Sequence, residues 1–510
     1  MSHLEDLPNE LLTLIISHVE SNKDLVSLSR ASRRLYAPCE LSDRRKYRRV
    51  RIRGRVGRIE KAFQLLLLIL RKPRIGGYVR HLEFQQFTRF RRGYSERPWE
   101  RTLGKEDLVR LEAATLEAGF MAPEDQRIMN ILMQAVPDGI DGGDPEGFRE
   151  AKIRTIYIAQ AVAALLISVC PNLESLALGN YPVRDRTGDH EPSGTDPYEK
   201  SMQYPLLRFL RSVNEKASRS RHLRRVRTIE LLPTFPDSNC NRYTRCDFVG
   251  WAGLISQLPK LESVTVQGMA QRGRENCGHG PESWNLQSIS LRNSRVSTDL
   301  LMEILCSLKQ LRSFTYTTGG RYTQSVWRFF FNPLTLFKCL LRHRTTLEVL
   351  DLDCEAQLHV DVESGRIRLQ GQIHNPDITW QVPRPPLSLW TEYGSLKDFT
   401  SLTHLSIGLQ CFISLAEGVR PSPTPAVGIL DLPPNLRYLC IRGYEKGKDP
   451  RIDTVMDRVI PAARAQCSNM PDIKGLDALI PQGCNTADDS HPPVRPFEDW
   501  TDDEVGPPDF

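Results

Sequence analysis

The chain has 510 residues, of which 40% are hydrophobic, and carries a formal net charge of +6. This length and composition are typical of a globular protein with a sizeable packed core. The longest apolar runs, at residues 63–70 and 161–170, are much shorter than the roughly 20 residues that a membrane-spanning helix needs. We therefore expect no membrane among the protein's partners.

Cysteine usage indicates a reducing compartment. The twelve cysteines are scattered without a Cys-x-x-Cys pair, and the chain has no Asn-x-Ser/Thr sequon. Several cysteines lie in apolar stretches, where a reduced thiol packs as a small hydrophobic residue. No secretory signal precedes Leu4, whose neighbours are acidic. We expect a cytoplasmic or nuclear location, or both, and no disulfide bonds.

The N-terminal segment has the pattern of three short helices. Apolar residues recur at helical spacing on one face of the first, at Leu11, Leu12, Ile15, Ile16 and Val19. Pro8 suits the first position of that helix. Asn22 can cap a second helix that runs through Leu28. A third short helix is expected from Ser32 to Tyr36.

The order and spacing of these elements resemble the F-box. The resemblance rests on the Leu7-Pro8 turn with Glu10 two residues later, and on the Asp24-Leu25 pair. It covers residues 4 to about 40. One departure is that the usual Val-Cys-Arg of the family is replaced by Ala-Ser-Arg at residues 31–33. The other interpretation of the same periodicity is a plain three-helix cap with no docking role.

The resemblance implies a partner. F-box segments dock onto the Skp adaptor of cullin-RING ubiquitin ligases, and apolar residues of the helices make that contact. The corresponding candidates here are Leu7, Pro8, Leu11, Leu12, Ile15, Leu25, Leu28 and Leu35. Some of them must instead pack the core of the F-box, and the sequence does not separate the two groups.

Basic charge is concentrated near the N-terminus. Residues 30–100 hold 21 Lys or Arg against 6 Asp or Glu, so the positive net charge is a local property. The densest part, residues 44–58, has two interpretations: a strip that contacts nucleic acid, or a half-buried strand with solvated arginines. Its arginines alternate with Val50 and Ile52, which favours the strand. We therefore do not expect nucleic acid as a partner.

A short apolar pattern then recurs along the chain: an apolar residue, two others, a second apolar residue, one other, and a third. Clear copies begin at Leu173, Leu261, Leu286, Leu311, Leu347, Leu402 and Leu436, and less clear ones at Tyr47, Val79 and Val226. The last two apolar positions alternate as in a strand, and a helical pattern often precedes the copy. One such helix should begin with Asn332 as cap and Pro333 at its first position. Because neither element buries its face alone, the units must stack.

The array resembles an irregular leucine-rich-repeat solenoid. The steps between the copies at Leu261, Leu286 and Leu311 are 25 residues each, inside the family's range of roughly 20 to 29. The other steps are longer, and Asn180 and Asn293 fall one residue before the usual asparagine position. The predicted fold class is therefore α/β, with a three-helix F-box followed by a leucine-rich-repeat-like solenoid whose curved parallel sheet has helices outside. An ordinary α/β sheet is the alternative, and the whole layout is similar to F-box proteins of filamentous fungi.

These patterns divide the chain into three regions. They are the F-box at 1–42, the solenoid with its insertions at 43–445, and a C-terminal extension at 446–510 with an acidic tail from about 487 that we expect to be disordered. The insertions are residues 136–147, 183–200 and 354–395. The last supplies Trp380, Trp390 and Tyr393, which either bind a target protein or fold the loop onto the core.

Catalytic signatures are absent from the sequence. It has no Gly-x-Ser-x-Gly, His-Glu-x-x-His or phosphate-loop motif. Asp351-Leu352-Asp353 has the form of a metal-binding Asp-x-Asp, but Leu350 and Leu352 fit inward strand positions, so the aspartates need only face water. We expect no enzyme, no catalytic residue, no metal and no cofactor.

The sequence thus predicts the substrate-recognition subunit of an SCF-type E3 ubiquitin ligase. Its F-box would dock on the Skp adaptor, and through it on the cullin-RING ligase, while the solenoid binds a target protein whose identity the sequence does not give. The alternative is a nucleic-acid-associated protein that uses residues 44–58 and has the F-box as a tether. Salt separates the two, because phosphate contacts weaken steeply as salt rises and apolar docking does not.

Overall fold

The computed structural model describes residues 7–17, 19, 22–52, 56–84, 98–121, 123–135, 145–179, 204–232, 243–271, 283–319, 331–357, 360–361, 368–369, 393–416, 432–466, 473–476 and 478–481. The predicted acidic tail, the insertion at 183–200, and Trp380 and Trp390 lie outside these residues.

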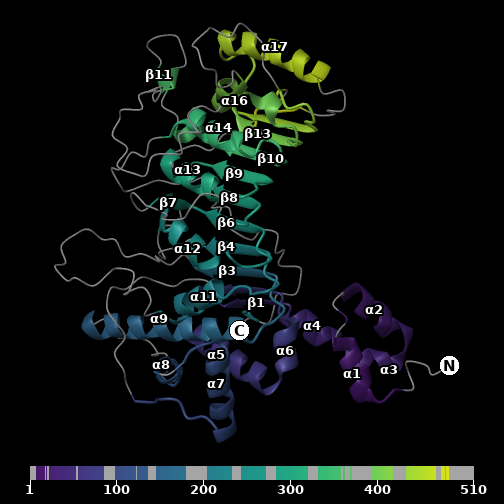
Figure 1. Ribbon diagram of the computed structural model, residues 1–510, viewed down its shortest axis with the longest axis vertical. Helices are drawn as coiled ribbons and strands as arrows, with labels where there is room; N and C mark the ends of the chain where they lie inside the picture. Colours follow the sequence, from purple (N-terminus) through teal and green to yellow (C-terminus); the bar gives the residue numbers. More distant parts are fainter. Residues whose placement is uncertain are drawn as a thin grey trace.

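The N-terminal helices form a small unit beside one end of the main body (Figure 1). They are α1 (Asn9–Ser17), α2 (Asn22–Ala31) and α3 (Arg33–Cys39). The third is longer than predicted, and Ser32 caps it by accepting a hydrogen bond from the backbone N–H of Arg34 at 3.1 Å. Glu40 ends α3 with a left-handed φ of 45° and begins α4 (Leu41–Tyr47). This sharp turn at Glu40 separates the three-helix unit from the rest of the chain.

The main body is built on one parallel sheet, as predicted. Its strands are β1 (Arg49–Ile52), β2 (His81–Phe84), β3 (Ser175–Gly179), β4 (Thr228–Leu232), β6 (Ser263–Gln267), β8 (Ser288–Arg292), β9 (Ser313–Thr317), β10 (Val349–Asp353), β13 (His404–Gly408), β14 (Tyr438–Arg442) and β15 (Ile473–Lys474). They lie side by side in chain order. The register is regular, since Ser263 pairs with Ser288 and Ser288 with Ser313. Every copy of the apolar pattern supplies one strand, whereas β15 has no copy and was not predicted.

Smaller elements accompany the sheet. They are the parallel pair β5 (Thr244–Cys246) and β7 (Met269–Gln271), the antiparallel pair β11 (Val360–Asp361) and β12 (Arg368–Leu369), and the 3-10 turns η2 (Glu355–Gln357) and η3 (Leu396–Asp398).

Helices stack beside the strands. They are α5 (Val56–Arg71), α6 (Pro73–Tyr78), α9 (Pro145–Ser168), α11 (Pro205–Glu215), α12 (Phe248–Ile255), α13 (Thr298–Ser307), α14 (Pro333–Leu341), α16 (Leu409–Ala416) and α17 (Pro450–Gln466). From α11 to α16 they follow one side of the strand stack (Figure 1). Asn332 caps α14, as predicted: its Oδ1 accepts hydrogen bonds from the N–H groups of Leu334 and Thr335.

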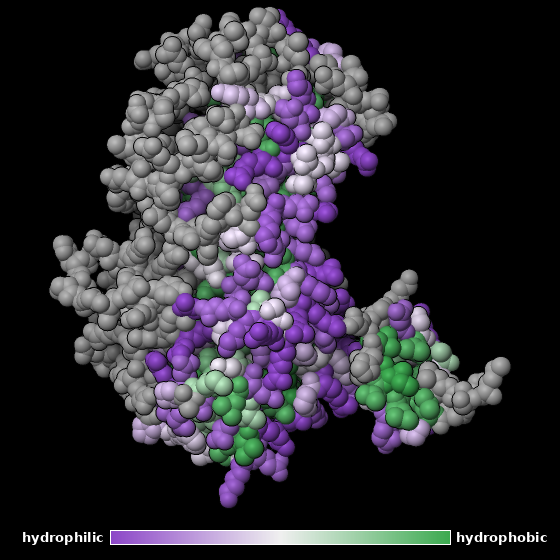
Figure 2. Space-filling view, viewed as in Figure 1, coloured by the Kyte–Doolittle hydropathy of each residue, from purple (hydrophilic) through white to green (hydrophobic). Residues whose placement is uncertain are grey.

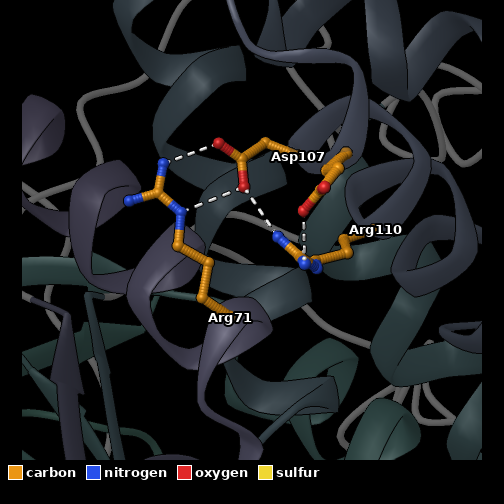
Figure 3. A network of polar contacts seen from close by, with 4 residues as sticks. Arg71, Asp107 and Arg110 are labelled. Atoms are coloured by element: carbon orange, nitrogen blue, oxygen red, sulfur yellow. Dashed lines mark hydrogen bonds and ion pairs between the residues drawn. The ribbon is translucent and has the colours of Figure 1, made fainter.

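Two further helices lie between β2 and β3 and were not predicted: α7 (Lys105–Glu117) and α8 (Glu124–Leu132). An ion-pair network joins α7 to α5 (Figure 3). The Arg71 guanidinium binds both carboxylate oxygens of Asp107, at 3.0 and 2.6 Å, and Arg110 also donates to Asp107 at 3.2 Å. The hydrogen bond from Arg71 lowers the pKa of Asp107. Asp107 therefore links the two helices as a carboxylate.

The basic segment at 44–58 spans three elements. It includes the end of α4, all of β1 and the start of α5. Val50 and Ile52 are buried, whereas Arg49 and Arg51 lie half-buried on the other face of β1. The predicted alternation of β1 is therefore confirmed, although the first residues of the segment are helical. Arg51 Nε donates to Glu83 Oε2 on β2 at 2.8 Å, so this arginine is neutralised within the sheet.

Candidate functional site

The N-terminal unit has a core of its own. Leu12 and Ile16, four residues apart on α1, meet Leu25 of α2 and Leu35 of α3 in a cluster completed by Cys39. Leu12 and Leu25 are fully buried and Leu35 is nearly so. These three predicted adaptor-facing residues thus pack the interior of the unit. Leu7 and Leu28 are half-buried against the same cluster.

The other side of α1 leaves large apolar side chains in solvent. Leu11 is 46% exposed, Leu14 55% and Ile15 42%, and Tyr36 on α3 is 63% exposed. We call these four residues the N-terminal apolar surface. Figure 2 shows hydrophobic residues gathered over this unit, in contrast to the largely polar main body next to it. An apolar cluster left in water on a small unit is typical of a protein-docking surface.

Sequence patterns found half of this surface. Leu11 and Ile15 were predicted to face the adaptor, and exposed Pro8 lies at the start of the same helix. Leu14 and Tyr36 were not predicted. The available signal for Leu14 was its i, i+3 spacing from Leu11, which puts the two on neighbouring positions of one helical face. For Tyr36 the sequence held no such signal, since its exposure depends on how α3 packs.

A polar joint holds the N-terminal unit against the main body. Glu40, at the end of α3, accepts from Arg74 Nη1 at 2.6 Å and from the Tyr78 hydroxyl. The guanidinium of Arg44 lies 4.6 Å from the centre of the Tyr78 ring. Burial and the bond to Glu40 raise the pKa of Tyr78 to about 12. Since α6 carries both Arg74 and Tyr78, this cluster fixes the orientation of the N-terminal unit relative to the first strands.

The strand face opposite the described helices is polar and rich in hydroxyl groups. The side chains of its central strands include Thr228, Ser263, Thr265, Ser288, Ser290, Ser313 and Thr315. Charged pairs lie toward the two ends of the sheet. Arg51 pairs with Glu83 near β1, and Arg442 Nη1 donates to Asp351 Oδ1 at 2.7 Å near β14. This face therefore offers many hydrogen-bonding groups between two charged regions.

Two carboxylates lie near each other on that face. Glu83 on β2 and Glu230 on β4 are both paired in register with Ala177 of the intervening strand. The small side chain of Ala177 leaves room above it. Burial, and then the charge of Glu83, raise the pKa of Glu230 to about 7, while Arg292 opposes the shift. Part of the Glu230 population is therefore protonated at neutral pH.

Of the predicted target-binding residues, the structure describes Tyr393. Its side chain is 44% exposed, and Lys338 Nζ of α14 lies 5.5 Å from the centre of its ring. Tyr393 thus lies on the helix side of the array. The other two predicted target-binding residues, Trp380 and Trp390, are outside the described ranges.

Within the described part of the chain, no group of three or more His, Cys, Asp and Glu residues could hold a metal ion. Asp351 of the Asp-x-Asp motif binds Arg442, and its neighbours Leu350 and Leu352 are buried. No helix among the described residues combines the length and apolarity needed to cross a membrane.

Comparison with known families identifies the N-terminal unit. A family model described as F-box-like matches residues 4–53. The match includes α1 to α4 and β1, and therefore every residue of the N-terminal apolar surface. No curated protein matches the chain. The chain thus carries an F-box-like domain at residues 4–53.

Proposed function

We propose that the chain, with its F-box-like domain at residues 4–53, is the substrate-recognition subunit of an SCF-type E3 ubiquitin ligase. The F-box-like domain docks on the Skp adaptor, and the strand-and-helix array binds a target protein. The observation that carries this proposal is the N-terminal apolar surface, since Leu11 and Ile15 are exposed in a domain that already has a complete core.

In this role the chain itself makes and breaks no covalent bonds. It holds a target near the ubiquitin-charged E2 enzyme that the cullin-RING complex brings, and so raises the target's effective concentration at the thioester. Such a receptor must hold its adaptor-binding domain and its target-binding array in a fixed relative orientation. The joint of Glu40, Arg74 and Tyr78 supports this requirement, because it ties the F-box-like domain to α6.

The array is proposed to be leucine-rich-repeat-like. Its support is the chain-order stacking of parallel strands, all of which except β15 are supplied by a copy of the apolar pattern, with helices along one side. We propose that the polar strand face and the insertion at 354–395 recognise the target, with Trp380, Trp390 and Tyr393 as contact residues. A cytoplasmic or nuclear location fits this role.

The alternative of nucleic-acid binding has weaker support. Several arginines near the basic segment are paired with carboxylates: Arg51 with Glu83, Arg74 with Glu40, and Arg80 with Glu174. The positive charge of those side chains is thus already partly balanced by carboxylates of the same chain, which leaves less of it for phosphate groups. Binding to the adaptor through apolar residues should also persist at high salt, whereas phosphate contacts should be lost.

Affinity purification from cells tests the proposal. Deleting residues 4–53 is unsuitable, because it removes β1 and uncovers the edge of β2. The full chain should instead be compared with Leu11→Asp/Ile15→Asp. The full chain is expected to recover the Skp adaptor and a cullin, and the variant neither. Absence of both from the full-chain sample would refute the proposal.

A further inference from the structure

Two cysteines from successive helices meet on the helix side of the array. Cys306 is in the last turn of α13 and Cys339 is in α14, and these helices pack together. Hydrogen bonds align these helices at both ends: the Asn332 N–H donates to Thr298 Oγ1 at 2.6 Å, and His343 Nε2 lies 3.1 Å from the carbonyl oxygen of Leu305. The second contact brings the end of α13, with Cys306, next to the turn of α14 that carries Cys339, and Arg342 lies beside both thiols. Cys306 is half-buried, whereas Cys339 is buried.

The two sulfurs are chemically unequal. The hydrogen bond from Cys339 and the charge of Arg342 lower the pKa of Cys306 to about 7, although burial opposes the shift. The same hydrogen bond, together with burial, raises the pKa of Cys339. A partly exposed thiolate beside a cation is the reactive form of cysteine, and a protonated thiol next to it is a suitable second partner.

A second cysteine pair shows that two neighbouring sulfurs do not by themselves give an accessible thiolate beside a protonated thiol. The sulfurs of Cys354 and Cys411 are 3.1 Å apart, but both residues are buried. Burial raises the pKa of Cys354, and the nearby acidic residues Glu355 and Asp353 act in the same direction. Cys354 and Cys411 therefore lack both the access and the positive charge found at Cys306.

We propose that Cys306 and Cys339 form a peroxide-sensitive dithiol that closes into a disulfide between α13 and α14. The Cys306 thiolate attacks one peroxide oxygen, so that an S–O bond forms, the O–O bond breaks, and the released hydroxide takes up a proton as water. The sulfur of Cys339 then loses its proton and attacks Cys306, which forms the S–S bond and releases the second water. Two thiols are oxidised as one hydrogen peroxide is reduced to two waters. A thiol reductant reverses the change.

This modification site is independent of the proposed ligase role. It lies in the middle of the array, on elements remote in sequence from the F-box-like domain. A bridge there joins two consecutive helix–strand units across the segment between residues 306 and 339. Oxidation is therefore expected to leave the adaptor-binding surface unchanged.

Peptide mapping of the full-length reduced protein tests the inference. The protein is treated with equimolar hydrogen peroxide at pH 7, blocked with N-ethylmaleimide and digested with trypsin without reduction. Cleavage at Lys and Arg, except before Pro, isolates Cys306 in peptide 296–309, Cys339 in 339–342, Cys354 in 345–366 and Cys411 in 398–437. We expect a dithiothreitol-sensitive link between the first two peptides, and none between the last two.

Two variants sharpen the test, with circular dichroism to show that each is folded. Cys339→Ser should leave Cys306 as a sulfenic acid that dimedone labels. Arg342→Gln should slow alkylation of Cys306 at pH 7, which in the wild type should be about tenfold faster than for an ordinary thiol, because about half of it is thiolate. The proposal is overturned if Cys306 in the folded wild type reacts no faster than an ordinary thiol, or if its oxidation yields no link to Cys339.

Discussion

Leu11 and Leu12 are neighbours in sequence but lie on different faces of α1: Leu12 is fully buried, and Leu11 is 46% exposed. An α-helix turns by about 100° per residue, so adjacent residues of a two-sided helix often divide between core and surface. Here the division separates residues that hold the F-box-like domain together from residues available to a partner. It gives a matched pair for mutagenesis.

The first prediction concerns stability. Leu12→Ala should destabilise the F-box-like domain by about 2 to 4 kcal/mol, because it removes a buried side chain and leaves a cavity. Leu11→Ala should change its stability by less than about 0.5 kcal/mol, since that side chain is largely in water already. Urea denaturation, monitored through hydrogen exchange of the backbone amides of α1 to α3, measures the change in stability of both variants. Equal losses in the two variants would show that Leu11 also packs the core.

The second prediction concerns the joint at Glu40. Glu40→Ala removes the acceptor of Arg74 and Tyr78 and should loosen the F-box-like domain from α6 without unfolding either part. Hydrogen exchange in α6 should speed up, and small-angle X-ray scattering should report a larger radius of gyration. Arg71→Ala is the control, because it breaks the unrelated pair with Asp107 on α7 and should leave the domain's orientation unchanged. Identical scattering for Glu40→Ala and the wild type would contradict this role.

The third prediction concerns pH. The folded-state pKa of Glu230 is about 7, above its unfolded value near 4.3, so folding favours the protonated form. The stability that protonated Glu230 contributes to the fold is fully present below about pH 4. It is lost as the pH rises through the folded-state pKa of about 7. In Glu230→Gln this loss should disappear. The free energy of unfolding of the variant, measured against that of the wild type, should therefore be higher at pH 8 than at pH 4, by at most about 3 kcal/mol.

Denaturation of wild type and Glu230→Gln across that pH range checks this prediction. Thr315→Val, a substitution on the same strand face but on β9 and with no titrating group, is the control and should keep the wild-type pH slope. A Glu230→Gln variant with the same slope as the wild type would mean that Glu230 is not the group responsible.

The fourth prediction concerns target recognition. Replacing residues 376–393 with a Gly/Ser linker removes Trp380, Trp390 and Tyr393, and should abolish target capture while adaptor binding persists. The melting temperature should change by no more than a few degrees. Retained capture would move target recognition to the strand face, and a collapse of the fold would show that these aromatic residues are structural.

Sequence patterns predicted the strands of the sheet well because the alternate apolar residues of each pattern are buried. Leu350 and Leu352 illustrate this, since both are buried and their neighbour Asp351 is free to meet Arg442. The two-residue strand β15 is too short to carry such a pattern. Contacts between distant residues were also inaccessible: nothing in the sequence brings Cys306 to Cys339 or Glu40 to Tyr78. The division of the F-box leucines between core and surface likewise depended on how α1 packs against α2 and α3.

Calorimetric titration of the purified chain with the Skp adaptor tests the central claim most directly. Leu11→Asp/Ile15→Asp should bind at least about 30-fold more weakly than the wild type, since losing apolar anchors at an interface costs about 2 kcal/mol or more. Val109→Asp/Leu116→Asp is the matched control, because both residues are exposed apolar side chains on α7, and it should bind like the wild type. Wild-type affinity in a folded Leu11→Asp/Ile15→Asp protein would contradict the account.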